Sequence, residues 1–355
     1  MTRLIAVAPV LPEHRYSQAE ITEAFLEVCL DGGVGSAALV RRLHASALVE
    51  NRHLVLPLEQ YAKLDTFAAA NDVYLEAATD LGAEAVLRAL EDAGLAATDV
   101  DVLMSTSVTG VAVPSIEARI AQRLGMRNDV VRVPLFGLGC AGGAAGIARL
   151  DEQLRARPDA VGILVSVELC SLTTQREHTA VPHLVASALF GDGAAAVVAV
   201  GTAHPLHDST AGPTVRDSMS RLYPDSERAM GWDVGEWGLR IVLDADVPGL
   251  VERHLGADVQ EFLARNKLTT ADIGPWISHP GGPKVLQAVE SALDLTDDEL
   301  AVTWRSLRAI GNLSSASVLH VLADTWRADP PGGGREALLL AMGPGFASEL
   351  VLLDW

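Results

Sequence analysis

Cys140 is the residue whose type and neighbours could do chemistry most directly. It follows an extended segment, residues 131–135, and precedes a segment rich in small residues, 141–156, that is typical of a helix. A cysteine at the N-terminal end of a helix lies near free N–H groups and the positive end of the helix dipole, and both favour the thiolate. Cys140 is therefore a candidate nucleophile, although free cysteines are also commonly buried structural residues.

Three other interpretations fit the sequence poorly: a hydrolase nucleophile, a disulfide framework and a cysteine-type zinc site. A hydrolase nucleophile elbow has the pattern G-x-S-x-G, and position 138 here is leucine, so the pattern is broken. The chain has three cysteines, Cys29, Cys140 and Cys170, without paired spacing. This odd count argues against a disulfide framework and against a cysteine-type zinc site.

His279 and Asn312 are the polar residues best placed to assist such a nucleophile. His279 ends an apolar strand and is followed by Pro-Gly-Gly-Pro, a turn that would leave the side chain at a strand end, where α/β sites form. Asn312 precedes a predicted helix in the stretch GNLSSAS. Taken alone, each has an ordinary structural interpretation, since asparagine commonly caps helices.

The elements that must position these residues alternate between strand and helix. Strand–helix alternation predicts an α/β layered fold. Two apolar runs near the end, 337–342 and 349–353, predict a hairpin or two adjacent strands. Residues 201–240 are rich in turn formers and are interpreted as a connection between two halves. The other predicted helices are 73–93, 115–124, 247–266, 284–293 and 314–328, and the other predicted strands are 99–108, 161–169, 194–200, 239–243 and 276–278.

Composition narrows the class of protein. The 355 residues are ample for a buried core, and the formal net charge of −19 disfavours nucleic-acid binding. Arg41, Arg42 and His44 could form a local site for an anionic substrate, or could equally be surface cations on a helix. No signal-peptide pattern and no apolar run of about 18 residues is present, which predicts a cytoplasmic protein without membrane insertion.

Five ordered sequence blocks together resemble one family. They are FGLGCAGGAAG (136–146), LFGDGAAAVV (189–198), ISHPGGPKVL (277–286), GNLSSASVL (311–319) and MGPGFASEL (342–350). Their order and spacing, over nearly the whole chain, resemble the type III polyketide synthases, which include the chalcone and stilbene synthases. The resemblance implies a thiolase-like fold of two related α/β halves in an αβαβα arrangement. We expect the halves at residues 1–215 and 216–355 and a homodimer.

The resemblance also implies a mechanism. Cys140 would accept the acyl group, and His279 would hold its thiolate as an ion pair. His279 and Asn312 would then donate hydrogen bonds to the thioester carbonyl of the extender and stabilise the enolate left by decarboxylation. No metal and no cofactor beyond the coenzyme A (CoA) thioester substrates is expected.

Further positions are assigned by the same resemblance. Phe190 and Ile241 match two gatekeeper positions, and Ile241 departs from the plant pattern. Trp232 replaces a residue that is usually small and would shorten the cavity. Val113 matches a side chain that reaches across the dimer interface, and Arg42 and Lys284 match cations near the CoA phosphates. The remaining expected cavity residues are Cys170, Thr173, Met342, Gly343, Pro344, Gly345 and Phe346.

Product and substrate are the least determined features. The blocks around Cys140 and Cys170 look most like bacterial alkylpyrone or alkylresorcinol synthases. They predict a fatty or short branched acyl-CoA starter with malonyl-CoA or a substituted malonyl-CoA as extender. The alternatives are a single condensation, as in ketoacyl synthase III, and a non-catalytic acyl-CoA-binding scaffold. The sequence does not identify the starter, the number of condensations or the cyclisation.

Overall fold

The computed structural model describes residues 1–29, 37–175, 180–332 and 334–355. Within these residues, nine strands form one mixed sheet in the order β11-β12-β13-β8-β1-β7-β6-β4-β5. Their bounds are β1 Arg3–Val10, β4 Val102–Thr106, β5 Val131–Leu135, β6 Val161–Leu169, β7 Asp192–Val200, β8 Thr214–Leu222, β11 Ile273–Ser278, β12 Glu336–Gly343 and β13 Ala347–Asp354. Two hairpin-like pairs stand apart, β2 (His14–Ser17) with β3 (Asn51–Leu54) and β9 (Met230–Gly235) with β10 (Gly238–Leu243).

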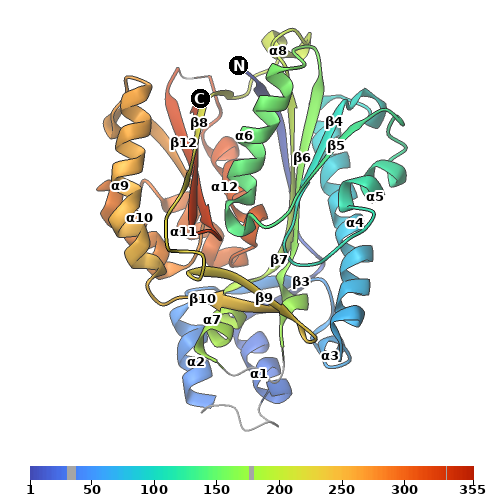
Figure 1. Ribbon diagram of the computed structural model, residues 1–355, viewed down its shortest axis with the longest axis vertical. Helices are drawn as coiled ribbons and strands as arrows, with labels where there is room; N and C mark the ends of the chain where they lie inside the picture. Colours follow the sequence, from blue (N-terminus) through green and yellow to red (C-terminus); the bar gives the residue numbers. More distant parts are fainter. Residues whose placement is uncertain (30–36, 176–179, 333) are drawn as a thin grey trace.

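Helices divide the molecule into five layers, which Figure 1 shows edge-on. Helices α6 and α12 lie in the centre, between the strands of the N-terminal half and those of the C-terminal half. Helix α4 covers one outer face and the pair α9–α10 covers the other. The predicted αβαβα arrangement is thereby confirmed. The helix bounds are α1 Gln18–Cys29, α2 Ala37–Ser46, α3 Leu58–Tyr61, α4 Phe67–Ala93, α5 Ile116–Arg123, α6 Gly142–Arg155, α7 Val181–Leu189, α8 Leu206–Ser209, α9 Val247–Arg265, α10 Pro283–Leu293, α11 Ala301–Ile310 and α12 Ser317–Ala328.

The small residues of α6 allow this helix to pack closely against the segment that leads into α12. A Cβ atom on Gly143 would lie 2.4 Å from the carbonyl oxygen of Ser315, which begins the approach to α12. Such a contact is far shorter than van der Waals distance, so only glycine fits. The glycine at this position therefore brings the Cys140 segment and the Asn312 segment together.

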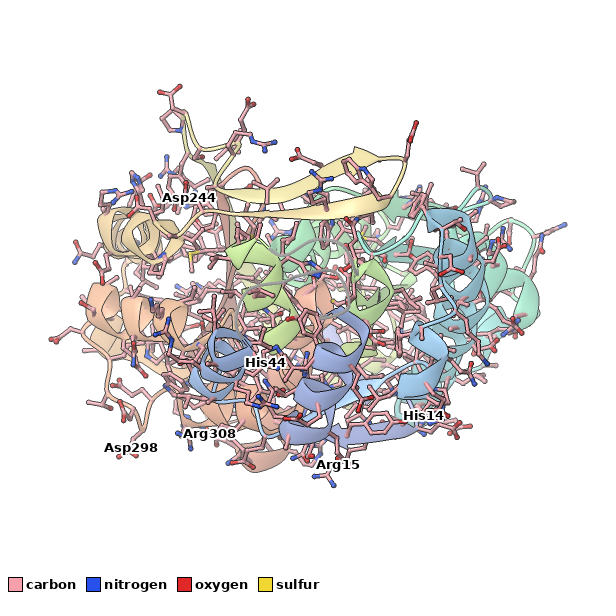
Figure 2. The ribbon with its side chains drawn as sticks, turned by 90° about the horizontal axis from the view of Figure 1, so that it is seen from below. His14, Arg15, His44, Asp244, Asp298 and Arg308 are labelled. Carbon is pink, nitrogen blue, oxygen red and sulfur yellow. The ribbon has the colours of Figure 1, made fainter. Side chains whose placement is uncertain are left out.

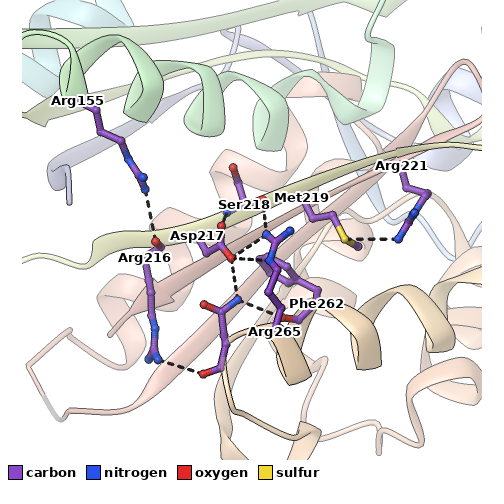
Figure 3. A network of polar contacts seen from close by, with 9 residues as sticks. Arg155, Arg216, Asp217, Ser218, Met219, Arg221, Phe262 and Arg265 are labelled. Atoms are coloured by element: carbon purple, nitrogen blue, oxygen red, sulfur yellow. Dashed lines mark hydrogen bonds and ion pairs between the residues drawn. The ribbon is translucent and has the colours of Figure 1, made fainter.

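Strand β8 corrects the sequence interpretation of residues 201–240. The segment was predicted to be an irregular connection, yet it contains β8 and β9, and the expected boundary after residue 215 falls inside β8. The sequence of β8, TVRDSMSRL, is too polar to predict a strand by its pattern. In the structure its polar groups have hydrogen-bond partners. Asp217 accepts hydrogen bonds from Arg265 and Asn266, and Arg155 of α6 donates to the carbonyl of Arg216 (Figure 3).

The remaining predicted elements agree with the structure to within a few residues, except that α4 begins six residues early and the strand predicted at 99–108 covers only 102–106. The closing pair is confirmed as two antiparallel strands, β12 and β13. Strands β1 to β3 and helices α1, α2, α3, α7, α8 and α11 were not predicted. In the described part of the chain, no helix is long and apolar enough to cross a membrane.

Candidate active site

One pocket brings residues of both halves together at the lower end of the molecule in Figure 1. It lies between the ends of the sheet strands and a cover made of α1, α7 and the β9–β10 pair. The cavity volume is about 140 Å³. Its walls are mostly apolar, as is typical of small-molecule sites.

Cys140 lines this pocket at the start of α6. The thiol is buried, with the side chain 6% exposed, and lies 3.8 Å from the hydroxyl oxygen of Ser314. Gly139, which precedes it, has φ of +50°, and a Cβ there would lie 2.5 Å from Pro344. Glycine at 139 therefore lets the closing loop of β12–β13 approach the thiol.

Asn312 lies beside the thiol, on the loop between α11 and α12. Its backbone pairs with Phe190 as an isolated bridge, and its N–H donates to the carbonyl of Leu189. Gly311 makes this contact possible, because a Cβ at its φ of +74° would lie 2.6 Å from that same carbonyl. The Asn312 carboxamide donates to the carbonyl of Gly281, at 3.4 Å, which ties it to the turn that follows His279.

His279 is buried, 6% exposed, at the end of β11, as predicted from its strand-end position. Its backbone N–H donates to the carbonyl of Leu340 on β12. Both ring nitrogens are buried and have no hydrogen-bond partner among the described residues. Buried polar atoms usually have a partner, so the two nitrogens distinguish this histidine from a purely structural one.

The protonation states follow from burial. Burial raises the pKa of the Cys140 thiol to about 12, with Glu168 adding to the rise and the side chains of Ser314 and Asn312 opposing it. Burial also lowers the pKa of His279 to about 3. Both groups are neutral here at pH 7, and the expected thiolate–imidazolium contact is not formed in this structure. The thiol has Ser314 and the Asn312 carboxamide as polar neighbours, whereas the ring nitrogens of His279 have none among the described residues.

Most of the predicted cavity residues line the pocket. They come from α7, the short helix after β6 and the β9–β10 pair, and Trp232 and Ile241 face each other across that pair. His279 and Asn312 stand behind this lining and are not part of it. The predicted residues that line the pocket are Cys140, Cys170, Thr173, Phe190, Trp232, Ile241 and Pro344.

The closing loop contributes less than expected. Of its five residues, Pro344 reaches the pocket. Met342 and Phe346 are buried in the core around α9, where Phe346 packs near Tyr223. Gly343 stands against the backbone of the Cys140 segment, where a Cβ would lie 2.5 Å from the carbonyl of Leu138. The loop therefore supports the Cys140 segment from behind, and Gly345 does not line the pocket.

The residues assigned to CoA and to the dimer lie on the surface. Arg42 of α2 and Lys284 of α10 are exposed and do not line the pocket. Val113 is 89% exposed. His44, which was grouped with Arg41 and Arg42, is instead buried, and its ring nitrogens contact the hydroxyls of Thr22 and Ser187. Figure 2, which views the molecule from below, labels its position. The side chain of Cys29 lies outside the described part of the chain.

Three further residues near the thiol were not predicted. Ser314 is inside the GNLSSAS block, two residues after Asn312, and only its contact with the thiol distinguishes it. Glu168 is a fully buried carboxyl that accepts from Thr109, Ser315 and the N–H of Val108. A charged residue inside an apolar strand was a usable signal for it. The third residue, Arg52, lies on β3 and lines the pocket, and no sequence pattern distinguishes it.

Comparisons with known proteins agree with this geometry. Residues 1–204 match the family described as chalcone and stilbene synthases, N-terminal domain, and residues 214–354 match its C-terminal domain. The 1,3,6,8-tetrahydroxynaphthalene synthase of Streptomyces peucetius subsp. caesius is 53% identical over 100% of this chain and 93% of its own. A putative chalcone synthase of Bacillus subtilis (strain 168) is 33% identical over 100% of this chain and 99% of its own.

A solved structure extends the likeness to three dimensions. The 1,3,6,8-tetrahydroxynaphthalene synthase of Streptomyces coelicolor A3(2), a bacterial type III polyketide synthase, superposes with a TM-score of 0.92 at 30% identity and covers 99% of both chains. These matches favour a polyketide synthase over a ketoacyl synthase III and over a non-catalytic scaffold. The chain therefore belongs to the chalcone and stilbene synthase family and is an acyl-transferring enzyme, a type III polyketide synthase.

Proposed function

We propose that Cys140 carries the growing polyketide and that His279 and Asn312 stabilise the enolate of each extender. The observation that carries the proposal is the buried thiol, with the Asn312 carboxamide close enough to lower its pKa and His279 on the adjoining turn with unpartnered nitrogens. Thiolate attack on a thioester releases CoA and leaves the acyl group on sulfur. Neutral donors at the second thioester carbonyl then stabilise the negative charge that decarboxylation leaves behind.

The resting thiol must lose its proton for this step. Burial raises the pKa of Cys140 and lowers that of His279, so each charge alone is unfavourable there. A paired thiolate and imidazolium offset each other's unfavourable charge, so contact between the ring and the sulfur would stabilise both ions. We propose that substrate entry brings this contact about, with the imidazole taking the thiol proton.

For the substrates, we propose malonyl-CoA as both starter and extender, with a polyhydroxylated aromatic product. Three relatives are named as 1,3,6,8-tetrahydroxynaphthalene synthases, and one of them is 53% identical to this chain. A naphthalene has ten ring carbons, and oxygens on alternate carbons are the pattern left by five two-carbon units. A product of this kind requires no starter other than a malonyl unit.

An alkylpyrone or alkylresorcinol remains the second candidate, from a fatty or short branched acyl-CoA starter. The apolar wall formed by Ile21, Leu54 and Leu58 favours it, because such a surface suits an alkyl chain. Trp232 faces the same space and limits its length. We expect Trp232→Gly to lengthen the products by at least one two-carbon unit, and unchanged chain length would contradict that role.

Product analysis by mass spectrometry decides between these candidates. The enzyme is incubated with malonyl-CoA alone and with malonyl-CoA plus a panel of acyl-CoA starters, beside a Cys140→Ala control. An aromatic product from malonyl-CoA alone supports the first candidate, and products only with an acyl starter support the second. We further propose that no cofactor is needed, so treatment with EDTA should leave the turnover rate unchanged.

Two surface features are proposed to serve assembly and CoA binding. Val113 and Phe136 are 89% and 65% exposed, and large apolar side chains so exposed are typical of interfaces. We propose a homodimer that covers Val113, which light scattering of the wild type and of Val113→Arg tests. We also propose that Arg42 and Lys284 contact CoA phosphates. Neutral substitutions of these residues should therefore weaken the binding of all CoA thioesters by the same factor.

A further inference from the structure

Arg52 is a buried cation in the pocket with part of its hydrogen-bonding capacity unused. It lies on β3, is 3% exposed and lines the pocket. Its Nη1 donates to the carbonyls of Ser187 and Phe190, at 2.6 and 2.9 Å. Its Nε and Nη2 are buried and have no hydrogen-bond partner in the part of the chain that the structure describes. A guanidinium has five N–H donors, and leaving several unpaired in a protein interior is costly.

The orientation of this guanidinium is fixed by its surroundings. Ser187 and Phe190 lie at the C-terminal end of α7, where free carbonyls and the helix dipole favour a cation. The side-chain stem packs against the Asn312 loop, where a Cβ on Gly311 would lie 3.2 Å from Cγ of Arg52. With Nη1 and the stem both held, the edge formed by Nε and Nη2 has a defined direction.

No carboxylate of the described residues neutralises this charge by contact. Asp192 is the carboxylate whose charge acts on Arg52, but its oxygens accept from the N–H groups of Val55 and Ser171 and from the Ser171 hydroxyl. No ion pair joins it to Arg52 among the described residues, although its charge acts on Arg52 through space. Burial lowers the pKa of Arg52 to about 10, so the group is still protonated at neutral pH. An unpaired buried cation favours an anionic ligand.

The free edge of the guanidinium is complementary in geometry to a carboxylate. Nε–H and Nη2–H lie side by side on a planar guanidinium and match the two oxygens of a carboxylate. We propose that this edge of Arg52 binds the carboxylate of a malonyl-type thioester inside the pocket. This inference rests on the proposed function and adds to it the residue that tells malonyl from acetyl groups.

The assigned role is recognition, separate from bond making. Malonyl-CoA and acetyl-CoA share the CoA part and the thioester, and they differ in one carboxylate. Arg52 therefore accounts for preference between them, whereas Arg42 and Lys284 would act on both alike. The catalytic groups Cys140 and Asn312 are not needed for this discrimination, so binding can be measured without turnover.

The test is a calorimetric titration of the Cys140→Ala protein with malonyl-CoA and with acetyl-CoA, with mass spectrometry to confirm that malonyl-CoA stays intact. We expect malonyl-CoA to bind roughly 10- to 100-fold more tightly, as for a two-pronged charge-assisted contact. Adding Arg52→Gln should abolish that preference and leave acetyl-CoA affinity unchanged. Adding Arg42→Gln should instead weaken both thioesters by the same factor. Equal affinity of the Cys140→Ala protein for the two thioesters overturns the proposal.

Arg52 also donates hydrogen bonds to the end of α7, so Arg52→Gln could lose its malonyl preference through misfolding. A second variant, Arg52→Lys, controls for this. Arg52→Lys keeps the charge but lacks the planar edge, so we expect a several-fold smaller malonyl preference with a melting temperature near the wild type. Full preference in a folded Arg52→Lys protein would overturn the assignment of the Nε–Nη2 edge.

Steady-state kinetics distinguish whether the carboxylate that Arg52 binds belongs to the extender or to the starter. If it belongs to the extender, Arg52→Lys raises the KM for malonyl-CoA with every starter. If it belongs to the starter, the all-malonyl product falls while acyl-started products persist. Wild-type enzyme that makes no polyketide refutes the proposed function, and the titration still reports on Arg52 independently.

Discussion

The site around Cys140 and the contact between β8 and α9 differ in whether their polar side chains have hydrogen-bond partners. At the contact, which is partly exposed, one carboxylate oxygen of Asp217 accepts from Nε and Nη2 of Arg265 and from the Asn266 carboxamide (Figure 3). At the site, Nε and Nη2 of the buried Arg52 and both ring nitrogens of the buried His279 have no hydrogen-bond partner among the described residues. The comparison separates a contact that stabilises the fold from groups whose hydrogen-bonding capacity is unused and can bind substrate.

The histidines sharpen this contrast on a smaller scale. His320 on α12 is buried like His279, but its Nε2–H donates to the carbonyl of Ala194, at 2.9 Å. His44 likewise has hydroxyl partners on both ring nitrogens. The same residue type therefore serves structure in two places and remains available for chemistry in the third.

The largest expected effect comes from exchanging the paired and unpaired histidines for glutamine. His279→Gln should lower the rate of polyketide formation about 10²- to 10³-fold, since it misplaces a donor to the developing oxyanion. His320→Gln should keep activity within a few-fold of wild type. Steady-state product formation, with melting curves of both proteins, measures this. Equal loss of activity in the two variants would break the comparison.

An intermediate effect is expected on acid stability. Burial lowers the folded-state pKa of His320 to about 4, with hydrogen bonding to Ala194 opposing the shift. Between pH 6.5 and 4 the unfolded chain binds more protons there, so the stabilisation is complete above pH 6.5 and is lost as pH falls. At pH 5 this histidine alone should cost about 2 kcal/mol of unfolding free energy.

Urea unfolding of wild type and His320→Gln at pH 7 and pH 5 isolates that contribution. The buried carboxyl of Asp192, whose pKa burial raises to about 6, acts in the opposite direction and is common to both proteins. We expect wild type to lose more stability than the variant between the two pH values. An identical loss would show that His320 is not protonated on unfolding.

The smallest effect is expected at the β8–α9 contact. Asp217→Asn should lower the unfolding free energy by about 1 kcal/mol, a modest value because the carboxylate is partly exposed. Turnover should be unaffected, since Asp217 is not part of the pocket. Denaturant unfolding and product assays test both halves of this prediction, and loss of turnover in a stable protein would contradict it.

Strand–helix alternation predicted an α/β layered fold, and local pattern drew attention to the three catalytic candidates, but their joint role and the αβαβα arrangement were implied by the family resemblance. Cys140, His279 and Asn312 all lie next to glycines or prolines, which mark strand and helix ends before any fold is known. Arg52 could not be found this way, because its role depends on α7 and the Asn312 loop, which are distant in sequence. Strand β8 was missed since Asp217 needs partners on α9 to be tolerated there.

The closing loop shows the limit of reasoning by resemblance. The resemblance of its sequence, Met-Gly-Pro-Gly-Phe, suggested five cavity residues, but Met342 at the end of β12 and Phe346 in the turn before β13 pack into the core around α9. Only Pro344 reaches the pocket. Which side of a turn faces a cavity is decided by what packs behind it.

The most direct test of the central claim is to find where the acyl group is attached. Wild type and Cys170→Ala proteins are incubated briefly with the thioester that gives product, digested, and mapped by mass spectrometry. We predict an acyl adduct on the peptide with Cys140 in both proteins and none on Cys170, although both thiols line the pocket. An adduct that disappears with Cys170→Ala, or is absent from Cys140 during turnover, would contradict the account.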